Sequence, residues 1–181
     1  MKIVSLNVGK KTAVQWRGKT IDTGIFKSKV KGPLFLDVHD VRNDIVIDRK
    51  HHGGVEQAVY AYGYNHYAYW RTLYPSLQID CGYMGENITV SELEETKIHI
   101  GAIYRLGEAV VEVTKPRQPC FKLGIRFNDQ RIVKQFWDTT KSGVYFRILQ
   151  TGNIAIGDEF SLIKEIKNSP TIADIFVSKR A

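Results

Sequence analysis

Hydrophobic and polar residues alternate in six segments of the chain, a pattern typical of strands with one buried face. Glycine turns at Gly107, Gly152 and Gly157 separate several of these segments. Short strands joined by such turns favour a barrel or a sandwich over a parallel sheet with crossover helices. The chain is therefore predicted to be mostly β, with strands over residues 2–7, 44–48, 98–106, 109–114, 143–149 and 159–164.

Three short segments instead have the spacing of helices with one apolar face. The first is predicted to begin at a cap formed by Asn65, and the second is predicted to begin near Asn128 or Asp129. The third has Ser169 as its cap and Pro170 at its first helical position. We expect one domain over residues 1–165, followed by a short helical tail over residues 166–181.

Length and composition are those of a folded globular protein. A chain of 181 residues buries roughly 70% of its unfolded surface. Its apolar stretches are too short to cross a bilayer, and the amino terminus lacks the pattern of a secretion signal. We therefore expect a cytoplasmic protein without a membrane segment, whose two cysteines, Cys81 and Cys120, stay reduced.

The formal net charge of +7 indicates an anionic partner or ligand. Lysines and arginines extend from Lys10 to Arg180, and no basic tail or arm stands out. The tyrosine-rich segment over residues 60–74 is nearly free of positive charge, unlike single-strand binding modules, which combine aromatic and basic residues. A hydrated basic surface is thus favoured, and a nucleic-acid partner is not expected.

Cys120 is the first candidate for chemistry. Pro116 and Pro119 stiffen the segment before it, which fixes the direction of the thiol. Arg117 and Lys122 place positive charge nearby, and such charge lowers a thiol pKa and favours the thiolate, which binds metals or attacks electrophiles. The alternative is a buried cysteine that acts as a small hydrophobic residue. The residues alone leave the two interpretations about even.

Two further motifs could line a ligand site. Gly53 and Gly54 follow a pair of histidines that ends at His52, and their backbone amides could approach a phosphate closely. Glu86 and Asn87 follow Gly85, where a carboxylate and an amide could orient a substrate. Each motif taken alone is more often an ordinary turn.

Zinc binding and hydrolase chemistry are two further roles that cysteines and histidines can have. The spacing of these residues does not match a structural zinc site. A hydrolase with a cysteine nucleophile is not excluded, because its catalytic cysteine and histidine need only be close in space and not in sequence. His52 or His66 could then serve as the base.

Taken in order, these motifs resemble the MOSC family, whose domain forms the carboxyl end of molybdenum cofactor sulfurases. The resemblance covers nearly the whole chain and is closest to the bacterial branch that reduces N-hydroxylated purines such as 6-hydroxylaminopurine. Its most specific stretch is 116–123, and the others are residues 52–60, Tyr67 with Trp70, and the segments 85–87, 100–101, 143–147 and 157–158, with the turn at Gly107.

The resemblance implies a barrel-like, mostly β fold that binds a molybdenum cofactor of the molybdopterin type. Cys120 would be the metal ligand and, with Glu86 near the substrate, a catalytic residue. Arg117 and Lys122 would balance the cofactor's negative charge. The cleft wall and the pterin contacts would come from His52, Gly53, Gly54 and Asn87.

The function implied by the resemblance is the reduction of small N-hydroxylated compounds with electrons from an external donor protein. Two alternatives remain: a carrier that hands over the cofactor or a sulfur atom without turnover, and, more weakly, a nucleic-acid-binding barrel. Relatives in this branch often have a helical carboxyl-terminal extension, whereas this chain ends soon after Ser169. We expect that difference to bear on substrate access and partner docking more than on cofactor binding.

Overall fold

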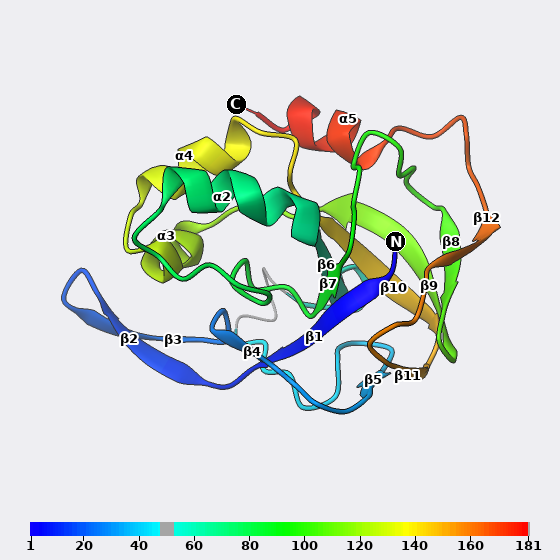
Figure 1. The fold of residues 1–181 in the computed structure, drawn as a ribbon, viewed down its shortest axis with the longest axis horizontal. Helices are drawn as coiled ribbons and strands as arrows, with labels where there is room; N and C mark the ends of the chain where they lie inside the picture. The colour runs from blue at the N-terminus through cyan, green and yellow to red at the C-terminus, as the bar shows by residue number, and fades with distance from the viewer. Residues whose placement is uncertain (48–52, 181) are drawn as a thin grey trace.

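The computed structural model describes residues 1–47 and 53–180 of the chain. Its main element is an eight-stranded sheet in the order β12-β8-β9-β10-β6-β7-β1-β4 (Figure 1). All neighbours in this sheet are antiparallel except β6 and β7, which are parallel. The strands are β1 (Ile3–Gly9), β4 (Lys27–Lys29), β6 (Val59–Gly63), β7 (Ile88–Val90), β8 (Ile103–Leu106), β9 (Ala109–Pro116), β10 (Val144–Gln150) and β12 (Ser161–Lys164).

The predicted mostly β fold is confirmed, and five of the six predicted segments contain a strand, namely β1, β8, β9, β10 and β12, whereas the other described strands were not predicted. In β9, for example, Ala109, Val111 and Val113 are buried, while the residues between them are partly exposed. The strand predicted over residues 44–48 is wrong for its described part, because residues 44–47 form no ladder. Asp44 instead accepts a hydrogen bond from the Gly9 amide, which ties this loop to the end of β1. The predicted segment 98–106 is a strand only from Ile103, and turns precede it.

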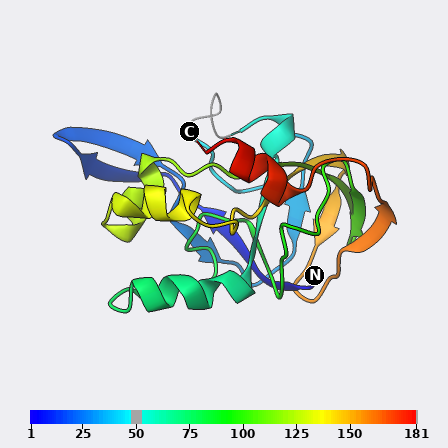
Figure 2. The ribbon, with the colours of Figure 1, turned by 90° about the horizontal axis from the view of Figure 1, so that it is seen from above.

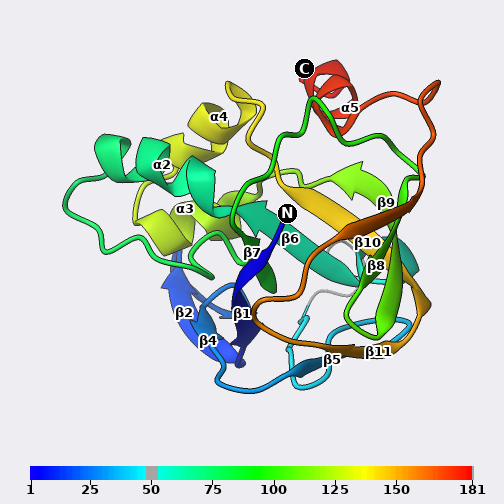
Figure 3. The same ribbon diagram turned by 45° about the vertical axis from the view of Figure 1, so that its right-hand side comes forward.

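The large sheet curls so that strands near its two ends meet (Figure 3). The Ile3 amide donates to Asp158, and the Gly157 amide donates back to Ile3. The edge strands β4 and β12 do not pair with each other in the part of the chain that the structure describes. The sheet is therefore strongly curved, as a barrel is, but it is not a closed ladder.

Two small sheets complete the β structure. β5 (Leu34–Leu36) pairs with β11 (Gly152–Ile154). β2 (Thr12–Trp16) pairs only with β3 (Lys19–Thr23), and this hairpin projects from the body of the molecule (Figures 1 and 2). We call residues 10–23 the arm.

Four α-helices and two 3-10 turns are described: η1 (Val55–Gln57), η2 (Tyr64–His66), α2 (Tyr67–Leu73), α3 (Phe121–Phe127), α4 (Arg131–Trp137) and α5 (Ile172–Ser178). Three of the helices were predicted, but α3 was not. Two of the predicted caps are wrong. Asn65 bonds to the backbone of Leu93, and α5 is capped by Thr171, whose hydroxyl accepts from the Asp174 amide.

Two apolar clusters hold these elements together. The larger is aliphatic and lies within the curved sheet. The smaller is mostly aromatic and packs α2, α3 and α4 together, with the Trp70 and Phe136 rings stacked at 5.9 Å. Phe176 of α5 belongs to this second cluster and is fully buried. No helix in residues 1–47 and 53–180 is both long and apolar enough to cross a bilayer.

Candidate cofactor-binding site

One pocket in the described part of the chain brings together segments that are far apart in sequence. Its walls come from the end of the arm and β4, the loop 44–47, the start of β6 and the segment that leads into α3. Four of the residues predicted from the sequence line it: Cys120, Arg117, Lys122 and Asn87. The fold therefore places the cysteine motif and the Gly85–Asn87 turn at the same cavity.

Cys120 is the residue immediately before α3, and it is half-buried and forms no disulfide in the part of the chain that the structure describes. Strand β9 ends at Pro116, and residues 117–120 form a short connection to the helix. The Leu123 amide donates to the Cys120 carbonyl, which fixes the backbone at this point. The thiol is thus neither sealed in the core nor fully exposed, as a metal ligand or a nucleophile requires.

Arg117 is a buried cation at the pocket wall, with 7% of the residue exposed. Burial acts to lower its pKa, but neighbouring Tyr60, Tyr145 and Cys120 outweigh burial and raise it, so the guanidinium stays charged. Its charge lies over the rings of Tyr60, at 5.3 Å, and Phe136, at 5.6 Å.

The Nη1 atom of Arg117 is buried and has no hydrogen-bond partner among the described residues. A buried donor without an acceptor is costly, so such donors in native proteins usually have a partner in water or a ligand. Arg117 is therefore suited to an anionic or strongly accepting group in the pocket.

Lys27 and Asp44 form an ion pair in the same pocket wall. This pair was not predicted from the sequence. Lys27 Nζ lies 2.5 Å from Asp44 Oδ2, and the side chains are 7% and 3% exposed. Asn87 donates from Nδ2 to the same carboxylate at 2.8 Å. Burial lowers the pKa of Lys27, and Asp44 opposes this effect. Asn87 is consequently held by Asp44 with its side chain at the pocket.

Glu86 does not lie among the pocket-lining residues, in contrast to the expected position near a substrate. The residue is fully buried, and its Oε1 accepts from the Tyr67 hydroxyl, the Gly82 amide and the Thr89 hydroxyl. Gly85 and Asn87 on either side reach the pocket, whereas the Glu86 side chain points into the interior. Burial raises its pKa. In this structure Glu86 ties α2, β7 and the 82–85 turn together.

The double glycine lies next to the pocket wall. Gly54 has a φ of 92° and is the residue directly before η1. Gln57, the last residue of η1, and Ala58 after it line the cavity. Neither Gly53 nor Gly54 is among the lining residues that the structure describes. His52, the remaining residue of this prediction, lies outside the described residues.

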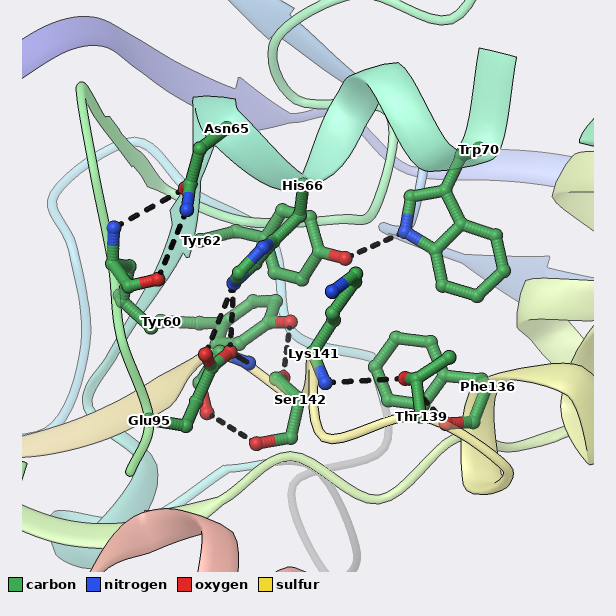
Figure 4. Close-up of polar contacts among 12 residues, drawn as sticks. Tyr60, Tyr62, Asn65, His66, Trp70, Glu95, Phe136, Thr139, Lys141 and Ser142 are labelled. Carbon is green, nitrogen blue, oxygen red and sulfur yellow. Dashed lines mark hydrogen bonds and ion pairs between the residues drawn. The ribbon is translucent and has the colours of Figure 1, made fainter. Parts of the chain in front are cut away.

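A buried polar network supports the aromatic side of the pocket (Figure 4). The Tyr60 hydroxyl donates to the Ser142 carbonyl at 2.8 Å, and the Gly143 amide donates to Glu95 Oε1 at 2.9 Å. Glu95 also contacts His66 Nε2, at 3.0 Å, and the two side chains are 4% and 7% exposed. The network fixes the Tyr60 ring, over which Arg117 lies.

This network also bears on the cysteine hydrolase alternative. His66 is engaged with Glu95 and does not line the pocket with Cys120, so it is not placed to act as that thiol's base. In residues 1–47 and 53–180 no three His, Cys, Asp or Glu side chains gather in a way that could hold a metal ion.

Comparisons with known proteins agree with the fold. The chain is 37% identical over 161 residues to the uncharacterized protein YflK of Bacillus subtilis (strain 168), covering 89% of this chain and 72% of YflK. It is 39% identical over 150 residues to a protein named "Reductase" of Gibberella moniliformis (strain M3125 / FGSC 7600), covering 81% of this chain but 27% of that protein. The crystal structure of YiiM from Geobacillus stearothermophilus superimposes with a TM-score of 0.79 and 34% identity, covering 97% of this chain and 81% of YiiM.

The MOSC domain family matches residues 48–161, which include Cys120 and its flanking motif as well as β6 to β10. The match and these relatives agree with the motifs singled out in the sequence. The chain belongs to the MOSC domain family and to its YiiM-like branch.

Proposed function

We propose that this protein binds a molybdenum cofactor of the molybdopterin type through Cys120 and reduces N-hydroxylated compounds such as 6-hydroxylaminopurine. The observation that carries the proposal is the pocket in which the half-buried Cys120 lies with a buried arginine, Arg117, whose Nη1 has no acceptor among the described residues. Membership of the MOSC family and the relative named "Reductase" support a redox role.

The residues of the pocket fit this cofactor. A thiolate is a suitable soft ligand for the metal, and the described residues offer no protein cage that would compete with the dithiolene of the pterin. Arg117 and Lys122 would balance the negative charge of the dithiolene and the phosphate. The Asn87 amide, held by Asp44, would contact the pterin.

The reaction consumes two electrons and two protons, converting an N–OH group to N–H and releasing water. When bound, the cofactor supplies a metal that accepts oxygen and exchanges electrons. Cys120 would hold the metal, and Tyr60 and Tyr145 line the aromatic side of the same pocket. Lys27 Nζ is the buried ammonium at this wall, and we assign it the delivery of a proton to the departing oxygen. Its lowered pKa makes it a better acid than an exposed lysine.

Replacement of Cys120 with serine tests the proposal. Cys120→Ser should remove molybdenum from protein made in a host with an intact cofactor pathway, and should lower 6-hydroxylaminopurine reduction by at least about a thousandfold. Cys81→Ser is the matched control, because Cys81 is also a half-buried cysteine without a disulfide to any described residue but does not line the pocket. Metal content by mass spectrometry and substrate loss with reduced methyl viologen are the measurements.

The same experiment separates the carrier alternative. A wild-type protein that contains molybdenum but consumes no N-hydroxylated compound with methyl viologen would be a carrier and not a reductase. A Cys120→Ser protein that keeps both metal and activity would overturn the ligand assignment. The external donor protein and the cytoplasmic location expected from the sequence stay predictions.

A further inference from the structure

Positive charge is concentrated in one amino-terminal part of the chain. Residues 10–31 contain seven of the 26 lysines and arginines but one of the 19 acidic residues, so they carry +6 of the net charge of +7. The cations are Lys10, Lys11, Arg17, Lys19, Lys27, Lys29 and Lys31. The expectation that no basic arm exists is therefore wrong.

Four of these seven cations lie on the arm, which projects from the body (Figure 2). Lys10, Lys11, Arg17 and Lys19 are all exposed. Lys11 pairs at 2.8 Å with Asp22, the one acidic residue in the sequence of the arm. Arg17 lies in the two-residue turn at the tip, with a φ of 49°. The arm thus presents an excess of positive charge to solvent.

The arm is held firmly at its base and leads directly to the pocket. A Cβ on Gly9 would lie 2.2 Å from the Gly24 carbonyl oxygen, and one on Gly24 would lie 2.0 Å from the Ile45 carbonyl oxygen, so backbone packs on backbone there. Farther out, the Trp16 ring stacks on Phe121 at 6.0 Å, next to Cys120 in the chain. Thr23 at the end of the arm lines the pocket, as do Gly24 directly after it and Lys27 at the start of β4.

We infer that the arm is the docking surface for an acidic electron-donor protein that carries a reduced flavin or an iron–sulfur centre. This inference rests on the proposed function, because N–OH reduction needs two electrons from outside the chain. Complementary charge speeds encounter and orients partners, an effect suited to short-lived electron-transfer complexes. A partner bound along the arm would lie at the opening beside Cys120.

Two other roles fit the arm less well than docking of a donor protein: preventing aggregation and binding nucleic acid. Lysines on unpaired strands discourage edge-to-edge aggregation, but that role does not require the exposed charge to continue at Lys31 in the body. A nucleic-acid site would offer open aromatic faces for base stacking. Trp16 is the aromatic residue of the arm, and its ring is already engaged by Phe121 and by Arg17 at 5.3 Å.

Charge reversal on the arm tests the inference with the cofactor-loaded protein. The variant Lys10→Glu, Arg17→Glu and Lys19→Glu keeps the Lys11–Asp22 pair that braces the hairpin. The matched control reverses three exposed cations on and near β8 and β12: Arg105, Lys164 and Lys167. The probe is an acidic flavodoxin, reduced by its own reductase. Reduced methyl viologen, a small cation with no protein surface to dock, serves as the comparison donor.

At low ionic strength the arm variant should show a KM for flavodoxin raised by at least roughly tenfold, and added salt should shrink the difference. Turnover with methyl viologen should equal that of the wild type, and the control variant should behave as the wild type with both donors. Direct titration of flavodoxin should give the same ranking of affinity.

The outcomes are distinguishable. Normal methyl viologen turnover with a flavodoxin KM that the arm variant does not change overturns the docking surface and leaves the proposed function in place. If the wild type turns over with neither donor, the proposed function fails. The docking surface is then judged by the flavodoxin titration alone: salt-sensitive binding that the arm variant weakens supports it, and the absence of such binding overturns it. The docking assignment is also overturned if the arm binds duplex DNA as tightly as flavodoxin. It is likewise overturned if the wild type is a dimer that the arm variant dissociates.

Discussion

Lys27 and Asp44 show how much one buried ion pair can matter at the residue scale. Their side chains are 7% and 3% exposed, whereas those of Lys29 and Asp80, the next pair along β4, are 54% and 62% exposed. Removing one member of a buried pair leaves an uncompensated charge, but exposed pairs contribute little. The two lysines therefore make a matched comparison.

We predict that Lys27→Met lowers the free energy of unfolding by about 3 to 5 kcal/mol, because Asp44 keeps its charge in a buried site. The double variant Lys27→Met/Asp44→Asn should recover most of that loss, since the amide still accepts from the Gly9 amide. Lys29→Met should change stability by less than about 1 kcal/mol. Urea denaturation measures all three, and equal losses for Lys27→Met and Lys29→Met would show that burial does not decide the effect.

The site could be predicted from sequence where local chemistry is unusual. Two prolines and two cations around Cys120 marked the thiol, and Arg117, Lys122 and Asn87 lie with it in the pocket. Lys27 could not be found this way, because the residues 27, 29 and 31 are three alternating lysines with no local feature to separate them. What distinguishes Lys27 is Asp44, a partner 17 residues away in a loop.

At the scale of elements, the start of β10 depends on close backbone packing against β6. Gly143 has a φ of 68°, and a Cβ there would lie 2.6 Å from both the Ala61 carbonyl oxygen and the Tyr60 ring. Gly18, at the tip of the arm, has a similar φ of 75° but nothing within 4 Å of such a Cβ. The pair separates the cost of backbone strain from the cost of a clash.

We expect Gly18→Ala to cost about 1 kcal/mol, the penalty of a left-handed conformation for alanine. Gly143→Ala should cost roughly 3 kcal/mol or more, because the methyl group must also displace Tyr60 or the β6 backbone. Thermal unfolding of both variants gives the comparison. If both variants melt at the same temperature, the contact between β10 and β6 accommodates the added methyl group at little cost, contrary to this prediction.

Elements with strong periodicity were predicted, and elements defined by tertiary contacts were not. Strands β9 and β10 alternate cleanly and pair along most of their length. Helix α3 is seven residues long and contains Gly124, so its sequence gives little helical signal. It forms because Leu123 and Phe127 pack into the aromatic cluster. The arm is instead a local hairpin, and it was missed because no residue of β2 and only Thr23 of β3 is buried, so neither strand has the apolar face that produces clear alternation.

At the scale of the whole molecule, the pocket extends beyond the part of the chain that the family matches. The matched region, residues 48–161, supplies Cys120, Arg117 and Asn87. Lys27 and Asp44 precede it, and both belong to the described wall of the same pocket. A ligand in this pocket would therefore contact β4, β6, α3 and the loop 44–47 at once, and would stabilise the fold as a unit.

This arrangement predicts a higher melting temperature for cofactor-loaded protein. A ligand present at about 100 times its dissociation constant adds about 2.7 kcal/mol to the free energy of unfolding. For a chain of this size that corresponds to a rise of roughly 5 to 10 °C. Calorimetry should compare protein from two hosts, one able and one unable to make the molybdenum cofactor.

Wild-type protein from the first host should melt at a higher temperature than wild-type protein from the second. The Cys120→Ser variant should melt at the same temperature from both hosts, because it retains no metal. A molybdenum-containing wild type that melts no higher than its cofactor-free form would mean that the metal is bound away from this pocket.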